Sequence, residues 1–472
     1  MPIVSAAVSL CVVSLCQPEL APSPGVADRL ADVSPARLMA SVEKLCTFET
    51  RHTLSDTKSP TRGIGAAREW LRAELATTSP RLRASLEPFD VPKSARLPDG
   101  AHVVNVVAVL PGTSDAARDR AYYVVGHYDS RNADAMDATG AAPGANDDAS
   151  GTALVLECAR VLAAHPCEST IVFLCTAGEE QGLVGAHAHA KSLAGEQRYR
   201  FVQVLSNDIV GDPSPLAPDS GYAELFKDHT LNDGPFSEVI SDSQHENPGK
   251  RIVRVFSEGV PRNAAADVMA RIRSEGAESD SPSRQLARFV AFVAKRERTA
   301  IQPMLVFRQD RFLRGGDHSA FNEAGFPAVR FTVPAEDYSR QHQNVTEKDG
   351  KPYGDVASFV DGEYLANVTR LNLATLIHMA NAPTPPENAR IITAELATDT
   401  LLRWDASPEP DTAGYEVVYR LTTDADWTGV IDAGTKRELR VGLSKDNVFF
   451  GVRAYDRDGF RSPVSFAWAA KE

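Results

Sequence analysis

The fold is decided by three consecutive stretches: 121–126 (AYYVVG), 149–164 (ASGTALVLECARVLAA) and 170–175 (TIVFLC). The first and the third are short, almost entirely apolar runs of strand length, and the middle one repeats its apolar residues at helical spacing. An apolar strand of this kind is buried on both faces, which is typical of parallel strands joined by helices. The three stretches therefore predict an α/β domain with a mixed, mostly parallel sheet that helices cover on both faces.

The same alternation continues on either side. Further strands are predicted at 201–206, 304–307 and 328–332, and further helices at 35–45, 62–75, 182–193, 287–294 and 357–380. Ser34 and Pro35 supply the cap and the first position of the earliest helix. Residues 212–250 are rich in Pro, Asp, Ser and Gly and lack periodicity, so we expect a surface excursion that helps to shape a substrate cleft.

A change of pattern follows the stretch 382–387 (APTPPE), which reads as a stiff linker. Short strands separated by turns are predicted after it, at 399–404, 414–420 and 447–455. They predict a small all-β sandwich over 388–472, beside an α/β domain over 25–381. Trp404 and Tyr455 stand where fibronectin type III domains carry core aromatics, so the tail resembles that family; a generic sandwich is the alternative.

The N-terminus has the composition of a secretory leader. Residues 3–15 are apolar, and Ala, Pro and Ser follow up to residue 24, so we expect a leader over 1–24 and a secreted or periplasmic protein. No Lys or Arg precedes Arg29, however, and Cys16 sits in a poor lipoprotein context. Beyond the leader, Cys46, Cys158, Cys167 and Cys175 allow three disulfide pairings or remain buried thiols.

Charge and hydropathy exclude two classes of protein. The 472 residues carry a net charge of −13, which repels phosphate backbones and argues against nucleic-acid binding. No apolar run reaches the roughly 18–20 residues that a membrane-spanning helix requires.

Histidines and carboxylates follow the predicted strands at their carboxyl ends, where ligands bind in open α/β sheets. Two imidazoles and three carboxylates suit a pair of divalent ions, most simply two Zn²⁺ bridged by a hydroxide, because the charges then cancel. The candidate ligands are His127, Asp147, Glu180, Asp208 and His342.

Two further carboxylates have predicted roles. Glu179 adjoins a candidate ligand without being needed as one, which suits a general base. Asp129 is placed to accept the second N–H of His127. His187 and His189 are expected at the surface, and His165 at a helix end. His318 is expected either beside a ligand or in a structural position, and not as a ligand itself. Neither GxSxG nor HExxH occurs, which argues against a serine hydrolase and a zincin.

Five motifs in order carry a resemblance to a known family: 127–130 (HYDS), 143–151 (PGANDDASG), 177–186 (AGEEQGLVGA), 206–211 (SNDIVG) and 315–329 (GGDHSAFNEAGFPAV). They resemble the co-catalytic di-zinc aminopeptidases of peptidase family M28, which include aminopeptidase Y and secreted bacterial leucine aminopeptidases. The resemblance covers about residues 30–382 and implies a mixed sheet of about eight strands.

The resemblance also implies roles for individual residues. Asp147 would bridge the metals, with His127 and Asp208 on one ion and Glu180 and His342 on the other. Glu179 would be the base, and the Asp147–Asp148 peptide would be cis. The expected reaction is hydrolysis of an N-terminal peptide bond, with Tyr338 as an oxyanion donor and peptides with a free N-terminus as substrates.

Three alternatives remain open from the sequence. One is a glutaminyl cyclase on the same fold. Another is a dipeptidase or carboxypeptidase, for which Arg314 and Arg330 are candidate clamps of a substrate carboxylate. The third, from another class, is an inactive scaffold that displays its β-sandwich for adhesion. The sandwich itself is expected to bind a polymer, dock a partner or stabilise the enzyme.

Overall fold

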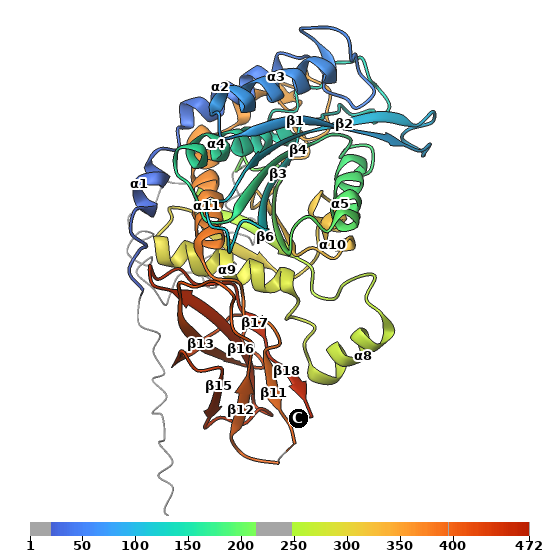
Figure 1. Ribbon diagram of the computed structural model, residues 1–472. Helices are drawn as coiled ribbons and strands as arrows, with labels where there is room; N and C mark the ends of the chain where they lie inside the picture. Colours follow the sequence, from blue (N-terminus) through green and yellow to red (C-terminus); the bar gives the residue numbers. More distant parts are fainter. Residues whose placement is uncertain (1–19, 214–247, 395, 472) are drawn as a thin grey trace, which may run out of the picture.

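The computed structural model describes residues 20–213, 248–394 and 396–471, which form an α/β domain and a C-terminal β-sandwich (Figure 1). Most of the predicted excursion at 212–250, and most of the predicted leader, lie outside the described residues. Ser23 is already buried against the domain, and its backbone amide donates to Glu297 at 3.0 Å.

The α/β domain is built on one eight-stranded mixed sheet in the order β1-β2-β4-β3-β5-β8-β6-β7. The central strands pair in parallel, whereas β1 with β2, β2 with β4 and β6 with β8 pair antiparallel. The predicted fold class is thereby confirmed. The strands are β1 Arg83–Val91, β2 Ala101–Leu110, β3 Arg120–His127, β4 Thr170–Thr176, β5 Phe201–Asn207, β6 Ile252–Ser257, β7 Gln302–Val306 and β8 Ala328–Thr332.

Helices cover both faces of the sheet because alternate strand residues point to opposite sides. On β3, Tyr122 and Val124 join the larger core, and Tyr123 and Val125 join the smaller one. The larger core packs under α1 Val26–Ala31, α2 Pro35–Cys46, α3 Gly63–Thr78, α4 Ser150–Ala164, α9 Pro282–Glu297 and α11 Gly362–Asn381. The smaller core packs under α5 Val184–Glu196 and α10 His318–Glu323.

Local signals set the helix starts. The Ser34 side chain accepts the backbone N–H of Arg37 ahead of α2, as its position before Pro35 predicts. The helix predicted from residue 287 begins earlier, at Pro282, where Ser281 caps it in the same way. Peripheral elements complete the domain: α8 Ala266–Glu275 and the hairpin of β9 Thr346–Lys348 with β10 Lys351–Tyr353.

The C-terminal part is a sandwich of two four-stranded sheets, ordered β15-β12-β11-β18 and β14-β13-β16-β17. Trp404 is buried in its core and lies 5.9 Å from Tyr415, ring centre to ring centre. Tyr455 was expected in the core as well, but it is only half-buried and its hydroxyl bonds to Asp432. The strands are β11 Arg390–Ile392, β12 Thr400–Arg403, β13 Thr412–Leu421, β14 Gly429–Gly434, β15 Glu438–Val441, β16 Val448–Asp456, β17 Ser465–Phe466 and β18 Trp468–Ala470.

A polar seam, which we define by Asp280, Arg288 and Arg420, joins the two parts where α9 lies between the sheet and the sandwich (Figure 1). Asp280 pairs with Arg288 beside it at 3.2 Å and with Arg420 of the sandwich at 2.7 Å, and all three side chains are buried. The linker is bound down too, since Glu409 of the sandwich accepts the backbone N–H of Thr384 at 2.9 Å.

Two expectations concern the surroundings of the protein. The four cysteines Cys46, Cys158, Cys167 and Cys175 are free thiols; the last three are buried, as the buried-thiol alternative predicts, and Cys46 is half-buried. Over the described parts of the chain, no helix combines the length and the apolar character that crossing a bilayer would take.

Candidate metal centre

The five predicted ligands meet at one edge of the sheet. His127 ends β3, Glu180 and Asp208 follow β4 and β5, Asp147 lies in the turn before α4, and His342 lies on the loop after β8. They form two groups that share Asp147, and within each group the ligand atoms lie within 4.8 Å of one another. Parallel strands ending side by side bring these distant segments together.

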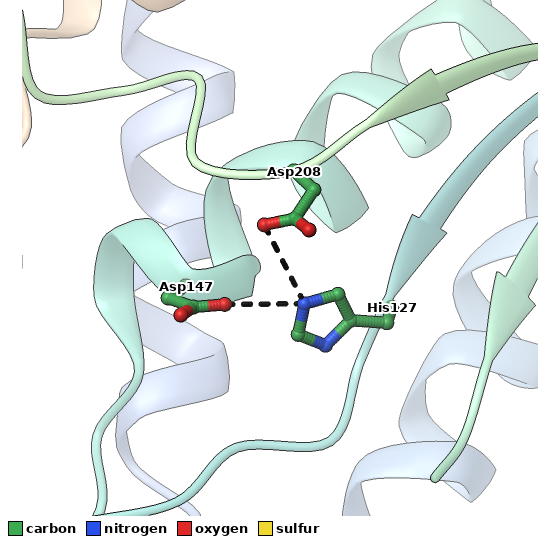
Figure 2. Close-up of side chains that lie close together, drawn as sticks. All are labelled: His127, Asp147 and Asp208. Carbon is green, nitrogen blue, oxygen red and sulfur yellow. Dashed lines mark ion pairs between the residues drawn. The ribbon is translucent and has the colours of Figure 1, made fainter. Parts of the chain in front are cut away.

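Asp147 directs its two oxygens to different groups. Its Oδ1 lies 3.1 Å from Nε2 of His127, which is also 3.8 Å from Oδ1 of Asp208 (Figure 2). Its Oδ2 lies 2.9 Å from Nε2 of His342, which in turn is 2.8 Å from Oε1 of Glu180. The carboxylate therefore has the geometry of a bridge between two cation positions.

The side chains fit metal ions on physical grounds. Nε2 of His127 and Oδ1 of Asp208 are buried and have no hydrogen-bond partner in the described structure. Burial disfavours a charged imidazole, but the surrounding carboxylates outweigh it and raise the pKa of His127 well above its usual value and that of His342 to about 9. A cluster that draws positive charge so strongly, with nitrogen and oxygen ligands, suits zinc.

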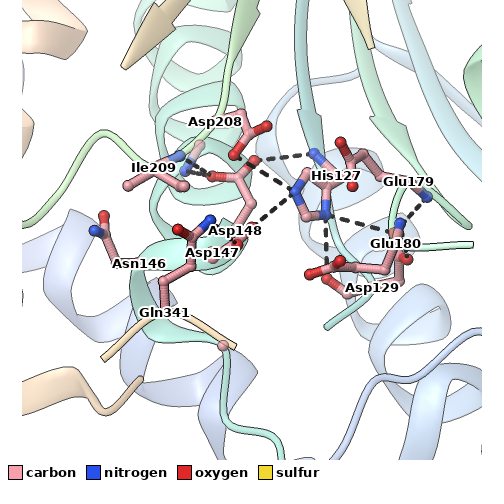
Figure 3. A network of polar contacts seen from close by, with 12 residues as sticks. His127, Asp129, Asn146, Asp147, Asp148, Glu179, Glu180, Asp208, Ile209 and Gln341 are labelled. Atoms are coloured by element: carbon pink, nitrogen blue, oxygen red, sulfur yellow. Dashed lines mark hydrogen bonds and ion pairs between the residues drawn. The ribbon is translucent and has the colours of Figure 1, made fainter. Parts of the chain in front are cut away.

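Asp129 organises the loop that carries the two glutamates (Figure 3). Its carboxylate accepts the backbone N–H groups of Glu179 and Glu180, each at 3.2 Å, and the hydroxyl of Thr53 at 3.2 Å. Its Oδ1 is 3.5 Å from Nδ1 of His127, which is closer to the Asp129 backbone oxygen, at 3.2 Å. The predicted contact with His127 is therefore shared between side chain and backbone.

Glu179 lies beside the group of His127, Asp147 and Asp208 and belongs to neither ligand group. Burial raises its pKa well above the usual value, and the negative charges of Asp208 and Glu180 act in the same direction. A carboxylate with a raised pKa beside a metal site is suited to accept a proton and to pass it on.

Neighbouring carboxylates hold the turn before α4. Asp148 accepts the backbone N–H groups of His127 at 3.0 Å and Gly151 at 2.8 Å. Asp355 accepts the backbone N–H of Asp147 at 2.7 Å. The Asp147–Asp148 peptide is cis, as the family resemblance implies.

Arg330 does not have the position of a substrate clamp. It is fully buried on β8, and its guanidinium lies 2.9 Å from Oδ2 of Asp208 and 2.9 Å from Oδ2 of Asp310. The predicted clamp role of Arg330 is wrong, because a fully buried guanidinium cannot reach a substrate carboxylate. Its pairing with Asp208 holds that carboxylate in place instead. Arg314 is partly exposed and donates to Gln341 at 2.9 Å.

The remaining predictions differ in outcome. Tyr338 belongs to neither group and is 62% exposed, with its ring 6.0 Å from the guanidinium carbon of Arg314. His318 is buried and bonds to the Gln309 carbonyl, a structural role as predicted. His189 is not at the surface: it is buried, and its Nδ1 lies 2.7 Å from Glu87.

Three contacts to the ligands escaped the sequence analysis. Gln341 donates to Oδ2 of Asp147 at 2.9 Å. Arg131 lies 3.0 Å from Oε2 of Glu180, and Arg96, on the turn between β1 and β2, donates to the Glu180 backbone carbonyl at 2.5 Å. No spacing rule marks these residues, because loops that are far apart in the sequence bring them to the site.

A sheet edge that presents two imidazoles and three carboxylates in two candidate cation sites is typical of metallohydrolases. Comparison with known proteins specifies the class further. The model of peptidase family M28 matches residues 105–232. A probable zinc metalloprotease of Leptosphaeria maculans is 40% identical over 450 residues, which cover 94% of this chain and 97% of that one. A probable zinc metalloprotease of Pyricularia oryzae is 41% identical, over 92% and 83% of the two chains. The chain belongs to peptidase family M28.

Solved structures with a similar arrangement include two kinds of enzyme. The LapA aminopeptidase of Legionella pneumophila has a TM-score of 0.49 and 16% identity, over 79% of this chain and 78% of that one. A glutaminyl cyclase of Fimbriiglobus ruber has a TM-score of 0.47 and 18% identity, over 73% and 95%.

Proposed function

We propose that this protein is a zinc aminopeptidase that binds two zinc ions and hydrolyses the N-terminal bond of peptides. The observation that carries the proposal is the divided carboxylate of Asp147, whose two oxygens face two different imidazoles. Each imidazole has one further carboxylate, Asp208 or Glu180, so each position would receive three protein ligands. Three ligands leave room for water or substrate, as in catalytic zinc sites.

When bound, the zinc ions would polarise the scissile carbonyl and acidify a water molecule. The residues of the chain would do the rest. Glu179 would accept the proton of that water and deliver it to the leaving amine, for which its raised pKa is suited. Asp129 would keep Glu179 in place by accepting the backbone N–H of Glu179. Carboxylates at the site, Glu179 and Asp208 foremost, would attract the ammonium group of the substrate.

The test is hydrolysis of a panel of aminoacyl-anilides by the full chain with zinc, with a chelator, and after Glu179→Gln. We expect zinc-dependent release, a loss of at least about 10²-fold in kcat in the variant, and two zinc ions per chain in both proteins. Glu69→Gln is the matched control, because Glu69 is an exposed glutamate on α3 that pairs with Arg72. Cleavage that survives Glu179→Gln would refute the base assignment.

The alternative functions predict different results in the same experiment. A glutaminyl cyclase would convert N-terminal glutaminyl peptides and leave every anilide intact. A carboxypeptidase would cleave only substrates with a free C-terminus. An inactive scaffold would neither bind zinc nor turn over any of these compounds.

A further inference from the structure

We propose that Arg131 binds an anionic oxygen of the substrate in the metal-loaded enzyme. This inference rests on the function proposed above and adds a residue that recognises substrate. Arg131 follows the HYDS motif at the end of β3, and its side chain is 15% exposed. Arg131 contacts two members of the ligand group that contains His342. Its Nε is 3.0 Å from Oε2 of Glu180, and its Nη2 is 2.7 Å from Nδ1 of His342.

The contact between Arg131 and His342 cannot coexist with a metal on the other nitrogen of that imidazole. A guanidinium has only donors, so a hydrogen bond from Nη2 of Arg131 to Nδ1 requires a neutral His342 whose hydrogen is on Nε2. An imidazole that holds a metal through Nε2 carries its hydrogen on Nδ1 and needs an acceptor there. Metal loading therefore separates Nη2 from His342, while Nε can stay beside Glu180.

Charge then favours an anion at the released guanidinium. Three other arginines near the site each have an acid partner that is not a candidate ligand: Arg314 pairs with Glu336, Arg340 with Asp212, and Arg330, besides Asp208, with Asp310. For Arg131, the acid partner is Glu180 itself, whose charge a metal ion would share. The Arg131 guanidinium is poorly exposed and would lose part of its counter-charge to the metal. A further anionic oxygen beside it would restore that charge and stabilise the guanidinium.

Two oxygens of a substrate at this centre carry the required negative charge. One is the free carboxylate of a dipeptide, whose C-terminus lies one residue beyond the scissile bond. The other is the oxyanion that develops on the scissile carbonyl itself. Both use the same chemistry, and a substrate pair that differs only in the terminal carboxylate distinguishes them.

The experiment compares Arg131→Gln and Arg131→Lys with wild type on Leu-Gly and on its C-terminal amide. If Arg131 binds the carboxylate, Arg131→Gln raises KM about 10- to 100-fold for Leu-Gly and leaves the amide unchanged. If it binds the oxyanion, kcat falls about 10²- to 10³-fold for both compounds at constant KM. Arg131→Lys keeps the charge but not the fork geometry and should lie between.

A second measurement does not depend on turnover. Calorimetry of the zinc-loaded proteins would compare leucine with leucinol, which lacks the carboxylate and cannot be hydrolysed. The carboxylate of leucine corresponds to the scissile carbonyl, so if Arg131 binds the oxyanion, Arg131→Gln should reduce the preference for leucine. Arg72→Gln is the matched control, since Arg72 is an exposed arginine that pairs with Glu69 far from the site.

Unchanged kinetics and unchanged binding in Arg131→Gln would overturn the inference. So would loss of zinc from that variant, because Arg131 would then act only by holding Glu180 and His342. Failure of the proposed function looks different: the wild type would then cleave neither compound or, as a carboxypeptidase or dipeptidase, only Leu-Gly and not its amide.

Discussion

Asp129 accepts the backbone N–H of Glu179 at 3.2 Å and thereby ties the loop after β4 to the loop after β3. The same carboxylate accepts the N–H of Glu180. One side chain thus sets the positions of the proposed base and of a proposed metal ligand.

Asp129→Asn should impair catalysis more than folding. An amide has one acceptor oxygen in place of two, and its NH₂ group would face backbone N–H groups. We expect kcat to fall about 10- to 100-fold, as for other residues that orient metal ligands. Steady-state kinetics with measured zinc content test this, and Asp90→Asn, at an exposed site beside His102, is the control. An unchanged kcat would contradict the role.

Arg330→Met should destabilise the metal-free protein strongly. The substitution leaves Asp208 and Asp310 in a buried site without their shared cation. Loss of one partner of a buried ion pair costs about 3–5 kcal/mol. Zinc would supply positive charge to Asp208, so the loss in unfolding free energy should be smaller with zinc than with a chelator. Denaturant unfolding under both conditions decides; equal losses would argue against metal binding by Asp208.

Asp280→Asn should weaken the attachment of the sandwich. It removes the anion shared by Arg288 and Arg420, both of which are buried. We expect a loss of about 3–5 kcal/mol in unfolding free energy, and calorimetry should show the sandwich melting before the α/β domain. Arg403→Gln breaks an exposed pair with Glu438 and should cost about 1 kcal/mol or less. A single undisturbed transition in Asp280→Asn would refute the prediction.

Glu168→Gln should stabilise the protein increasingly as the pH rises from about 4.5 to 7, and by a constant amount above that. Glu168 is half-buried at the junction of the two parts, and burial, reinforced by Asp411, raises its pKa to about 7. Because the folded pKa lies above the unfolded one, ionisation opposes folding as the pH rises from about 4.5 to 7. Below that window both states are protonated. Thermal unfolding at pH 3.5, below the window, and at pH 8 should show a higher Tm for the variant at pH 8 alone; an equal rise at both would exclude the ionisation.

The parallel core of the sheet could be predicted because β3, β4 and β5 are apolar on both faces. The hairpin of β1 and β2 was not among the predicted strands. β1 alternates between half-buried and exposed residues and contains Pro88, so its sequence lacks the apolar run of a central strand. Its position at the sheet edge comes from pairing with β2, which is a tertiary contact.

The candidate ligands could be proposed from the sequence because His127, Glu180 and Asp208 stand at or just after the carboxyl ends of strands, whereas Asp147 precedes α4 and His342 lies on the loop after β8. Arg131, Gln341 and Arg96 follow no such rule, since their contacts with Glu180, His342 and Asp147 depend on loop conformations. Tyr338 shows that closeness in sequence does not place a residue in the site: it stands four residues before His342 and is largely exposed.

The seam of Asp280, Arg288 and Arg420 limits how such a protein can be recombined. Its charges are split unevenly, with two on the α/β domain and one on the sandwich. A cut at the linker would therefore leave Asp280 and Arg288 paired on the α/β domain and leave Arg420 of the sandwich without its anion. Exchange of the sandwich for another module therefore requires these three positions to change together. We expect the α/β domain and the sandwich to be inherited as a pair.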